Sequence, residues 1–197
     1  CPGAARLQVV DLFKVVGERR IVVVCELPPD KMDQVSFDLP IMQEMGGTVD
    51  IEVSPLQPYA AFAADLRSLA GLGPLDPPSP AAGGGGSGEG ELFWVDCELS
   101  QEGLSQAEFL GLWAAQAEAT LQSAADGWVE HVWKVAGQHR VVSVVRVRDA
   151  GDLDRRLFGL PAAKSALGPH LNFTVKALRH YEAFAADVQE RLEPEEA

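Results

Sequence analysis

The sequence predicts an α+β fold made of two related units in tandem, and three observations carry this prediction. Residues 12–24 return as residues 132–144, with a lysine, a glycine and a run of β-branched residues at matching places. The motif Tyr-x-Ala-Phe-Ala-Ala-Asp occurs at 59–65 and again at 181–187. A Pro- and Gly-rich segment lies between the copies. Their separation of about 120 residues is that of a domain, because solenoid repeats recur every 20 to 50 residues or so.

These matches predict three parts of the chain. Residues 1–70 form an incomplete first unit, 71–90 a flexible linker, and 91–197 a complete second unit with a C-terminal helix. The linker holds four prolines and a Gly-Gly-Gly-Gly-Ser-Gly run. A chain of this composition and length spans on the order of 25 Å. It lacks the Lys-Ser/Thr pair of a phosphate-binding loop, which favours the linker interpretation.

The second unit opens with an alternating strand over 92–99, which places its Phe, Val, Cys and Leu residues on one face. Ser105 and Glu108 then have the spacing of a capping box, which predicts a helix to about residue 125. The buried stripe of this helix follows helical spacing and consists of Leu110, Trp113, Ala117 and Leu121.

Two strands over 128–135 and 140–148 flank a Gly-containing turn and are expected to pair as a hairpin. A second helix is expected over 151–167, with a break or kink at Pro161. A last strand over 171–175 and a short C-terminal helix complete the unit.

The resulting order, β-α-β-β-α-β, is ferredoxin-like, with both helices on one face of an antiparallel sheet. The matching elements of the first unit are a hairpin over 7–16 and 19–27, a helix over 32–45, a strand over 49–53 and a helix from Tyr59. Its opening strand and helix have no counterpart. We expect the two sheets to pair as an intrachain dimeric α/β barrel.

Composition narrows the classes of partner. A net charge of −13 repels phosphate backbones and argues against nucleic acid. No stretch approaches the roughly 18 consecutive apolar residues of a membrane span, and no signal peptide precedes the first strand. We therefore expect a soluble, cytoplasmic protein without a membrane partner. Because the chain opens on Cys1 rather than Met, we also expect part of the natural N-terminus to be missing.

The three cysteines, Cys1, Cys25 and Cys97, have no metal-ligand spacing, and the last two fall on predicted strands. This favours reduced, buried thiols. The sequence also lacks a zinc-site cluster, a nucleophile elbow, and Walker and dinucleotide motifs. Any chemistry is therefore expected to be acid/base work without metal or cofactor.

His131 is the main candidate for such chemistry, because the first unit has Asp11 at the matching position. An imidazole exchanges protons near neutral pH. Hydrogen bonding within the sheet is the alternative role. Glu118, on the predicted helix, could turn its carboxylate toward a pocket edge or lie on a solvated face.

Several other polar or aromatic residues lie on predicted strands. Asp50 and Glu52 share the polar face of one strand, and the second unit has Asn172 and Thr174 there. Antiparallel sheets often wet one face, so solvation is the alternative explanation. The predicted catalytic residues are His131, Glu118 and Asp96, and the predicted substrate contacts are Asp11, Trp133, Trp94, Asp50, Glu52 and Asn172.

The second unit resembles the muconolactone Δ-isomerase family, small proteins of the dimeric α/β-barrel class. The resemblance rests on Leu92-Phe93-x-Val95, on Glu118, and above all on the sequence His-Val-Trp-Lys-Val-Ala-Gly at 131–137. It covers roughly residues 91–180. A fainter likeness extends over 7–56, where Asp-Ile-Glu-Val at 50–53 looks like the family's last strand.

Members of that family isomerise a five-membered unsaturated lactone by moving a proton between carbons, without metal or cofactor. The resemblance implies that His131 and Glu118 transfer protons or orient the substrate. The family has a lysine where this chain has Asp96, which implies that electrostatic stabilisation of an enolate there is lost. Family members are single units that oligomerise, whereas this chain joins two.

The sequence therefore predicts a cofactor-independent isomerase or cyclase that acts by proton transfer on a small oxygenated, lactone- or polyketide-like molecule in specialised metabolism. His131, with Glu118 or Asp96, would handle the proton. The alternatives are a cofactor-free monooxygenase of the same barrel fold and a non-catalytic small-molecule-binding or scaffold module. The expected partner is a small-molecule substrate, and association into a homodimer or higher homo-oligomer stays open.

Overall fold

The computed structural model describes residues 7–78 and 89–192. The chain divides into two compact units: unit 1, residues 1–53 with 178–197, and unit 2, residues 54–177. This division differs from the repeat boundaries, because the helix Tyr59–Leu69 of the first repeat groups with unit 2 and the C-terminal helix of the second repeat groups with unit 1. The middle of the predicted linker, 79–88, lies outside the described residues.

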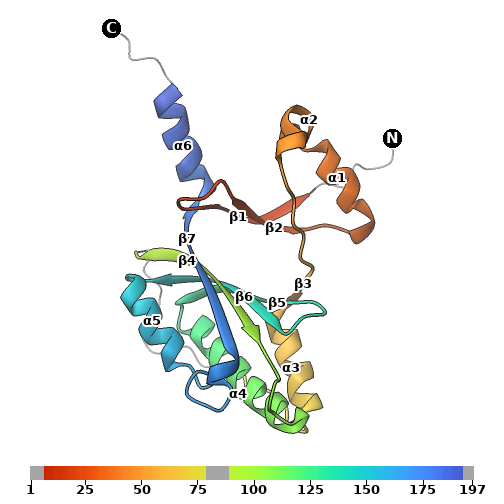
Figure 1. Cartoon of the computed structure of the whole chain (residues 1–197), viewed down its shortest axis with the longest axis vertical. Coiled ribbons are helices and arrows are strands. Elements are labelled where there is room, and N and C mark those ends of the chain that lie inside the picture. The colour runs from red at the N-terminus through yellow and green to blue at the C-terminus, as the bar shows by residue number, and fades with distance from the viewer. Residues whose placement is uncertain (1–6, 79–88, 193–197) are drawn as a thin grey trace. The chain divides into compact units, whose positions relative to one another are not determined.

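Unit 2 contains strands in the order β7-β4-β6-β5-β3 (Figure 1). The pairs β4–β6, β5–β6 and β3–β5 are antiparallel. From β4 to β7 the elements follow the predicted β-α-β-β-α-β order, and the short β3 adds a strand beside β5. The strand bounds are β3 Leu56–Pro58, β4 Glu91–Leu99, β5 Val129–Val135, β6 Arg140–Val147 and β7 Leu171–His180.

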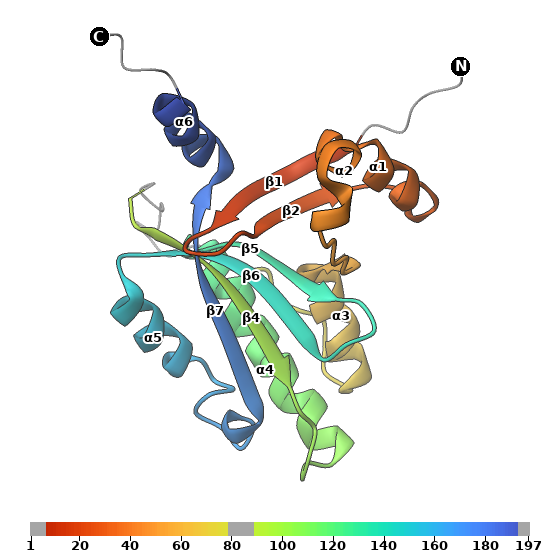
Figure 2. The same cartoon turned by 45° about the horizontal axis from the view of Figure 1, so that its top comes forward.

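Three helices cover one face of this sheet, which we call the helix face (Figures 1 and 2). They are α3 Tyr59–Leu69, α4 Gln106–Ala125 and α5 Ala150–Gly159. The predicted capping box is present: the Ser105 side chain accepts from the Glu108 backbone N–H, and the Glu108 carboxylate accepts from the Ser105 N–H. The second predicted helix, α5, ends at Gly159, ahead of Pro161, whose ring cannot continue it.

The core of unit 2 lies between the helices and the sheet. One cluster joins α3 and α4 to the strands through Leu66, Phe109, Trp113 and Ala117. A second cluster joins Leu153 and Leu157 of α5 to β4, β5 and β6. Within the predicted stripe of α4, Trp113 and Ala117 are buried, while Leu110 and Leu121 are only partly buried.

Unit 1 contains the hairpin β1 Gln8–Val15 and β2 Ile21–Glu26, the end of β7, and helix α6 Tyr181–Leu192. The single helix predicted over 32–45 is two short helices, α1 Met32–Asp38 and α2 Pro40–Met45. Leu39 between them is extended, with φ −63° and ψ 129°. The residue before a proline avoids helical geometry, and Pro40 therefore divides the helix.

The strand predicted over 49–53 is wrong. Residues 49–55 form no regular element, and both Asp50 and Glu52 are exposed there. The strand of this region is β3, which begins three residues after the end of the predicted strand and pairs with β5. Alternating sequence produces a half-buried strand only where a neighbouring strand supplies hydrogen bonds and a buried face. Here the neighbouring strand is β5, and it pairs with Leu56–Pro58 rather than with residues 49–53.

The same local arrangement occurs once in each unit. In unit 2, Lys134 pairs with Gln57 across β5 and β3, and its ammonium lies 5.2 Å from the ring centroid of Phe62 on α3. In unit 1, Lys14 pairs with Arg179 across β1 and β7, and its ammonium lies 5.4 Å from the ring of Phe184 on α6. Each lysine also donates to two carbonyls of its own hairpin turn.

The two hairpins agree in a second detail. The pairing register shifts between Val9 and Asp11 in β1, and between Val129 and His131 in β5. Asp11 and His131 therefore occupy matching positions after a β-bulge. These correspondences support the predicted repeat, which stays a prediction. They also show that the hairpin of β5 and β6 packs against α3, the motif helix of the first repeat, and the hairpin of β1 and β2 against α6, the motif helix of the second.

Candidate functional site

The sheet of unit 2 has a second face, which we call the far face, directed away from α3, α4 and α5. Successive strand residues point to opposite faces. Because Val95, Val132, Val141 and Phe173 point toward the helices, their neighbours belong to the far face. Its central residues are Trp94 and Asp96 of β4, Val142 and Val144 of β6, and His131 and Trp133 of β5.

The registers arrange these six residues in two rows across the strands. One row is His131, Val144 and Trp94, and the other is Trp133, Val142 and Asp96. Neighbouring strands lie about 4.8 Å apart, so the ends of each row are separated by about 10 Å of backbone. Val142 and Val144 in the middle of the rows are buried, whereas His131, Trp133 and Trp94 at their ends are half-buried.

The imidazole of His131 is stacked on the indole of Trp133. Their ring centroids are 5.3 Å apart and their planes differ by 11°. Both residues are half-buried. His131 and Trp133 are two residues apart on β5, so their side chains lie on the same face of the strand. The β-bulge that precedes His131 directs it to the far face. The stack restricts the imidazole's rotation while its two nitrogens remain at the ring edge.

Asp96 forms an ion pair with Arg140 of β6. The Arg140 Nε lies 2.8 Å and 3.0 Å from the two carboxylate oxygens, and the terminal guanidinium nitrogen also donates to Asp96. Asp96 is only 8% exposed. Sequence reasoning missed Arg140, although its register partner Glu98 makes an opposite-charge pair across the same strands. Asp96, which the sequence suggested as a catalytic carboxylate, is thus one partner of a bidentate ion pair.

Glu118 lies away from His131. It belongs to α4, in the helix layer, and forms an ion pair with Arg67 of α3. Its side chain is 43% exposed. The structure therefore brings Asp96 and His131 to the same face of the sheet and leaves Glu118 in the helix layer, where its pairing joins two helices.

The remaining predicted contacts are dispersed. Asn172 of β7 is exposed, on the far face between the inward-facing Leu171 and Phe173. Asp11, Asp50 and Glu52 belong to unit 1. The last two lie on an irregular exposed segment rather than on a strand.

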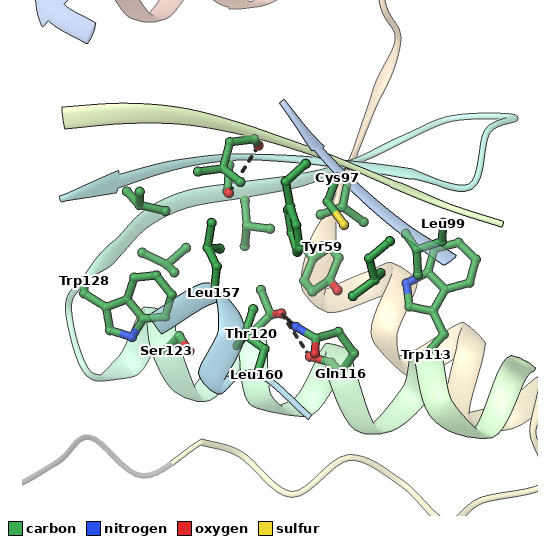
Figure 3. Close-up of a pocket in the computed structure, with 18 residues that line it drawn as sticks. Tyr59, Cys97, Leu99, Trp113, Gln116, Thr120, Ser123, Trp128, Leu157 and Leu160 are labelled. Carbon is green, nitrogen blue, oxygen red and sulfur yellow. Dashed lines mark hydrogen bonds between the residues drawn. The ribbon is translucent and has the colours of Figure 1, made fainter. Parts of the chain in front are cut away.

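A cavity lies on the opposite side of the same sheet, between the strands and α4 (Figure 3). Its volume is about 60 Å³. Trp113 and Trp128 lie at its two ends, and Leu157 and Leu160 contribute from the α5 side (Figure 3). None of the predicted site residues lines it. The sequence does contain residues that line the cavity, such as Trp113 of α4 and Tyr59, but their apolar, helical spacing is that of ordinary core positions.

The polar groups of the cavity come mainly from α4. The Gln116 amide donates to the Thr120 hydroxyl at 3.1 Å, and its carbonyl accepts from the Ala162 N–H at 3.0 Å. The hydroxyl of Ser123 donates to a carbonyl of its own helix at 2.7 Å. These groups are therefore satisfied within the protein, and among the described lining residues none carries a full charge.

Two lining residues are titratable, and both are held in the protonated form. Burial raises the pKa of the Tyr59 hydroxyl far above its usual range. Burial, with the neighbouring carboxylates of Asp96 and Glu98, raises the pKa of the Cys97 thiol to about 12. Neither group can act as a base at neutral pH, so the cavity itself supplies no proton acceptor of this kind.

Cys97 is expected to resist alkylation in the folded protein. At pH 8 a thiol whose pKa is about 12 is ionised to about one part in 10⁴, and the thiolate is the reactive form. Iodoacetamide labelling followed by peptide mass spectrometry should show Cys97 reacting at least 100-fold more slowly in buffer than in urea. Similar rates in both would contradict the burial of this thiol.

The same shift predicts how stability changes with pH. The unfolded thiol ionises near its ordinary value of 9.0, whereas the folded thiol keeps its proton until about 12. Unfolding between these values therefore releases a proton. The contribution of Cys97 to stability is fully present below pH 9 and decreases as the pH rises toward 12.

Residues 92–183, from the second residue of β4 to the first turn of α6, match the family model of muconolactone delta-isomerase. This part of the chain is muconolactone isomerase-like. No curated protein matches the chain. The muconolactone isomerase-like segment includes His131 and Glu118, two of the residues on which the resemblance rests, together with Trp133 and the Asp96–Arg140 pair.

In residues 7–78 and 89–192, no three His, Cys, Asp or Glu side chains are grouped closely enough to hold a metal ion. Within the same ranges, none of the helices combines the length and apolar character that a membrane span requires.

Proposed function

We propose that this protein is a cofactor-independent isomerase or cyclase that moves a proton on a small oxygenated, lactone- or polyketide-like molecule, with His131 as the proton-handling group. The match to muconolactone delta-isomerase supports an isomerase-like function. The position of His131 carries the rest of the proposal. It lies on the far face, stacked on Trp133, in the segment that most resembles the family.

The far face suits a flat, mostly apolar substrate. Val142 and Val144 are buried, at 3% and 0% exposure, and form the apolar layer between His131 on β5 and the β4 side chains. Trp94 and Trp133 offer aromatic surfaces at either side. A ring of five or six atoms that contacts these half-buried aromatic side chains would have one edge toward the imidazole, and its oxygen could point toward the opposite row.

The chemistry needs one group that takes and returns a proton. A neutral imidazole removes a proton from the carbon beside a carbonyl, and the electron pair moves into the conjugated system as an enolate. The resulting imidazolium returns the proton to a carbon farther along, which shifts the double bond. His131 ends neutral, so no other reagent is consumed. Arg140, paired with Asp96, places a cation on the face where negative charge develops.

Wild-type protein in D₂O with three β,γ-unsaturated γ-lactones that differ in ring substituents tests this proposal. The expected result is conversion to the α,β-unsaturated isomer with deuterium at the carbon that receives the proton, measured by NMR. Oxygen consumption that depends on substrate would instead identify a monooxygenase. Saturable binding of the lactones without conversion or exchange would identify a binding module.

A further inference from the structure

Strand β2 ends the sheet in unit 1, and among the described residues β1 is the strand with which it pairs (Figure 2). Alternate residues of an antiparallel strand turn their backbone N–H and C=O groups toward the same neighbour. The N–H of Val15 on β1 donates to the carbonyl of Arg20 at 3.0 Å, which sets the alternation. The backbone groups of Ile21, Val23 and Cys25 therefore face away from β1. We call this side of the strand the β2 edge.

The matching edge in unit 2 is occupied by a strand. In the predicted repeat β6 corresponds to β2, and β6 lies between β5 and β4. The carbonyl of His139 accepts from the N–H of Leu99 at 2.8 Å, so alternate residues of β6 from position 139 onward face β4. Positions 141, 143 and 145 belong to this set, and they correspond to 21, 23 and 25 of β2. The same backbone arrangement therefore receives a strand within unit 2.

The side chains along the β2 edge are apolar and accessible. Ile21 is 42% exposed and Val23 is 47% exposed, while Cys25 is half-buried. Edge strands are commonly protected from pairing by a lysine, a proline or a bulge. Strand β2 contains neither lysine nor proline, and the extra residue of the hairpin's bulge lies on β1. The β2 edge is therefore able to accept another strand.

The apolar part of β2 is complementary to itself in the antiparallel direction. When Val23 lies opposite Val23 of a second copy, Ile21 of each copy lies opposite Cys25 of the other. All three residues face the β2 edge, so each of these pairs exchanges two N–H to C=O hydrogen bonds. Directly opposite side chains lie about 5 Å apart, which brings the exposed valines and isoleucines into contact.

The charges at the two ends of β2 fit the same register. Arg20 then lies opposite Glu26 of the second copy, and the two-fold symmetry forms this attractive pair twice. Both residues are exposed. Within its own chain Arg20 has an exposed ion pair with Glu18 at 3.8 Å, which is weak enough to be exchanged. Sliding one strand by two residues can instead place Glu26 opposite Glu18, which is repulsive.

We propose that the β2 edge binds the β2 edge of a second copy of this chain, in an antiparallel pair centred on Val23. Each copy contributes the same backbone groups and the same charges, as a two-fold contact requires. One pair of six-residue strands buries less than the roughly 1,600 Å² of a standard interface, so the dimer is expected to be weak and reversible. The contact uses residues of unit 1 and does not depend on proton transfer at His131.

Sedimentation velocity of the full 197-residue chain under reducing conditions tests the proposal. The sedimentation coefficient is expected to rise from that of a monomer to that of a dimer between about 1 µM and about 1 mM protein, the range in which weak contacts dissociate. Arg20→Glu and Glu26→Arg each place like charges opposite one another and should each weaken dimerisation about 10-fold. An equimolar mixture of these two variants restores both attractive pairs and should dimerise as the wild type does.

The matched control for charge is Arg155→Glu on α5. The Arg155 side chain is 61% exposed, against 62% for Arg20, and it belongs to unit 2. Its reversal changes the net charge by the same amount and should leave dimerisation unchanged. His131→Gln should also dimerise as the wild type does, so failure of this contact and failure of the proposed isomerase are separate results.

Cysteine crosslinking tests the register, in a background in which Cys1 and Cys25 are replaced by serine. Val23→Cys places two thiols directly opposite one another, and a short bis-maleimide is expected to join them into a covalent dimer. Ile21→Cys is the matched control, because Ile21 has similar exposure on the same strand. Its two thiols would lie four residues apart along the strands, about 13 Å, and should crosslink far less. Denaturing electrophoresis measures both yields.

Three outcomes would overturn the proposal. The first is a wild-type chain that sediments as a monomer at every concentration, which would leave the β2 edge to a strand of a different protein or to none. The second is a mixture of Arg20→Glu and Glu26→Arg that dimerises no better than either variant alone. The third is crosslinking of Ile21→Cys as strong as that of Val23→Cys. The first is read from the wild-type protein and does not depend on the folding of any variant.

Discussion

His131→Gln is expected to lower the rate of lactone proton transfer by about 10²- to 10⁴-fold, the usual contribution of a positioned acid/base group. Glutamine retains hydrogen-bonding capacity and a similar reach but cannot take up a proton near neutral pH. The stack on Trp133 and the pairing with Val144 indicate that the side chain holds a defined position without supporting the core. The measurement is deuterium incorporation into the lactone by NMR, beside a thermal unfolding curve.

The control for this variant is His170→Gln. His170 is a half-buried histidine at the end of a short 3₁₀ helix, Gly168–His170, elsewhere in the family-matching segment. It should retain the wild-type rate. If His131→Gln also exchanges deuterium at the wild-type rate while remaining folded, His131 has no part in the chemistry and the proposed function loses its central residue.

Phe109→Ala is expected to destabilise unit 2 by about 3–5 kcal/mol, the cost of removing a large buried aromatic side chain. Phe109 is 2% exposed on α4. Its ring centroid lies 5.3 Å from that of Trp113 and 5.0 Å from that of His139, in the turn after β5. The residue therefore connects the helix to the strand that carries His131. Urea unfolding followed by circular dichroism measures the loss.

Phe158→Ala provides the matched control. Phe158 is the same residue type at the end of α5, but it is 70% exposed. Its truncation should change the free energy of unfolding by no more than about 0.5 kcal/mol. Equal effects at positions 109 and 158 would show that the core between α4 and the hairpin is not organised as the structure has it.

The regular elements of the muconolactone isomerase-like part could be predicted because their signals are local. Ser105 and Glu108 specify the start of α4 through their own hydrogen bonds, and Pro161 prevents α5 from continuing. The hairpin turn at Gly137 follows from its φ of +73°, which glycine adopts without steric cost. Each of these depends on residues a few positions apart.

The strand predicted over 49–53 failed for the opposite reason. Its alternation was sound, but strand formation depends on a partner, and β5 pairs with Leu56–Pro58 instead. The choice of site residues had the same limitation. The family resemblance implied a shared role for His131 and Glu118, whereas the sheet places His131 on the far face and Arg67 pairs with Glu118 in the helix layer.

The sequence by itself determined the β-α-β-β-α-β order of residues 91–180, the matching hairpins and the family resemblance. Only the tertiary structure decided which helix packs on which hairpin, that Asp96 is paired with Arg140, and that a cavity forms beneath Trp113. The physical reason is range. Capping, turns and periodicity act between near neighbours, whereas ion pairs, buried donors and cavities arise where distant segments meet and water is excluded.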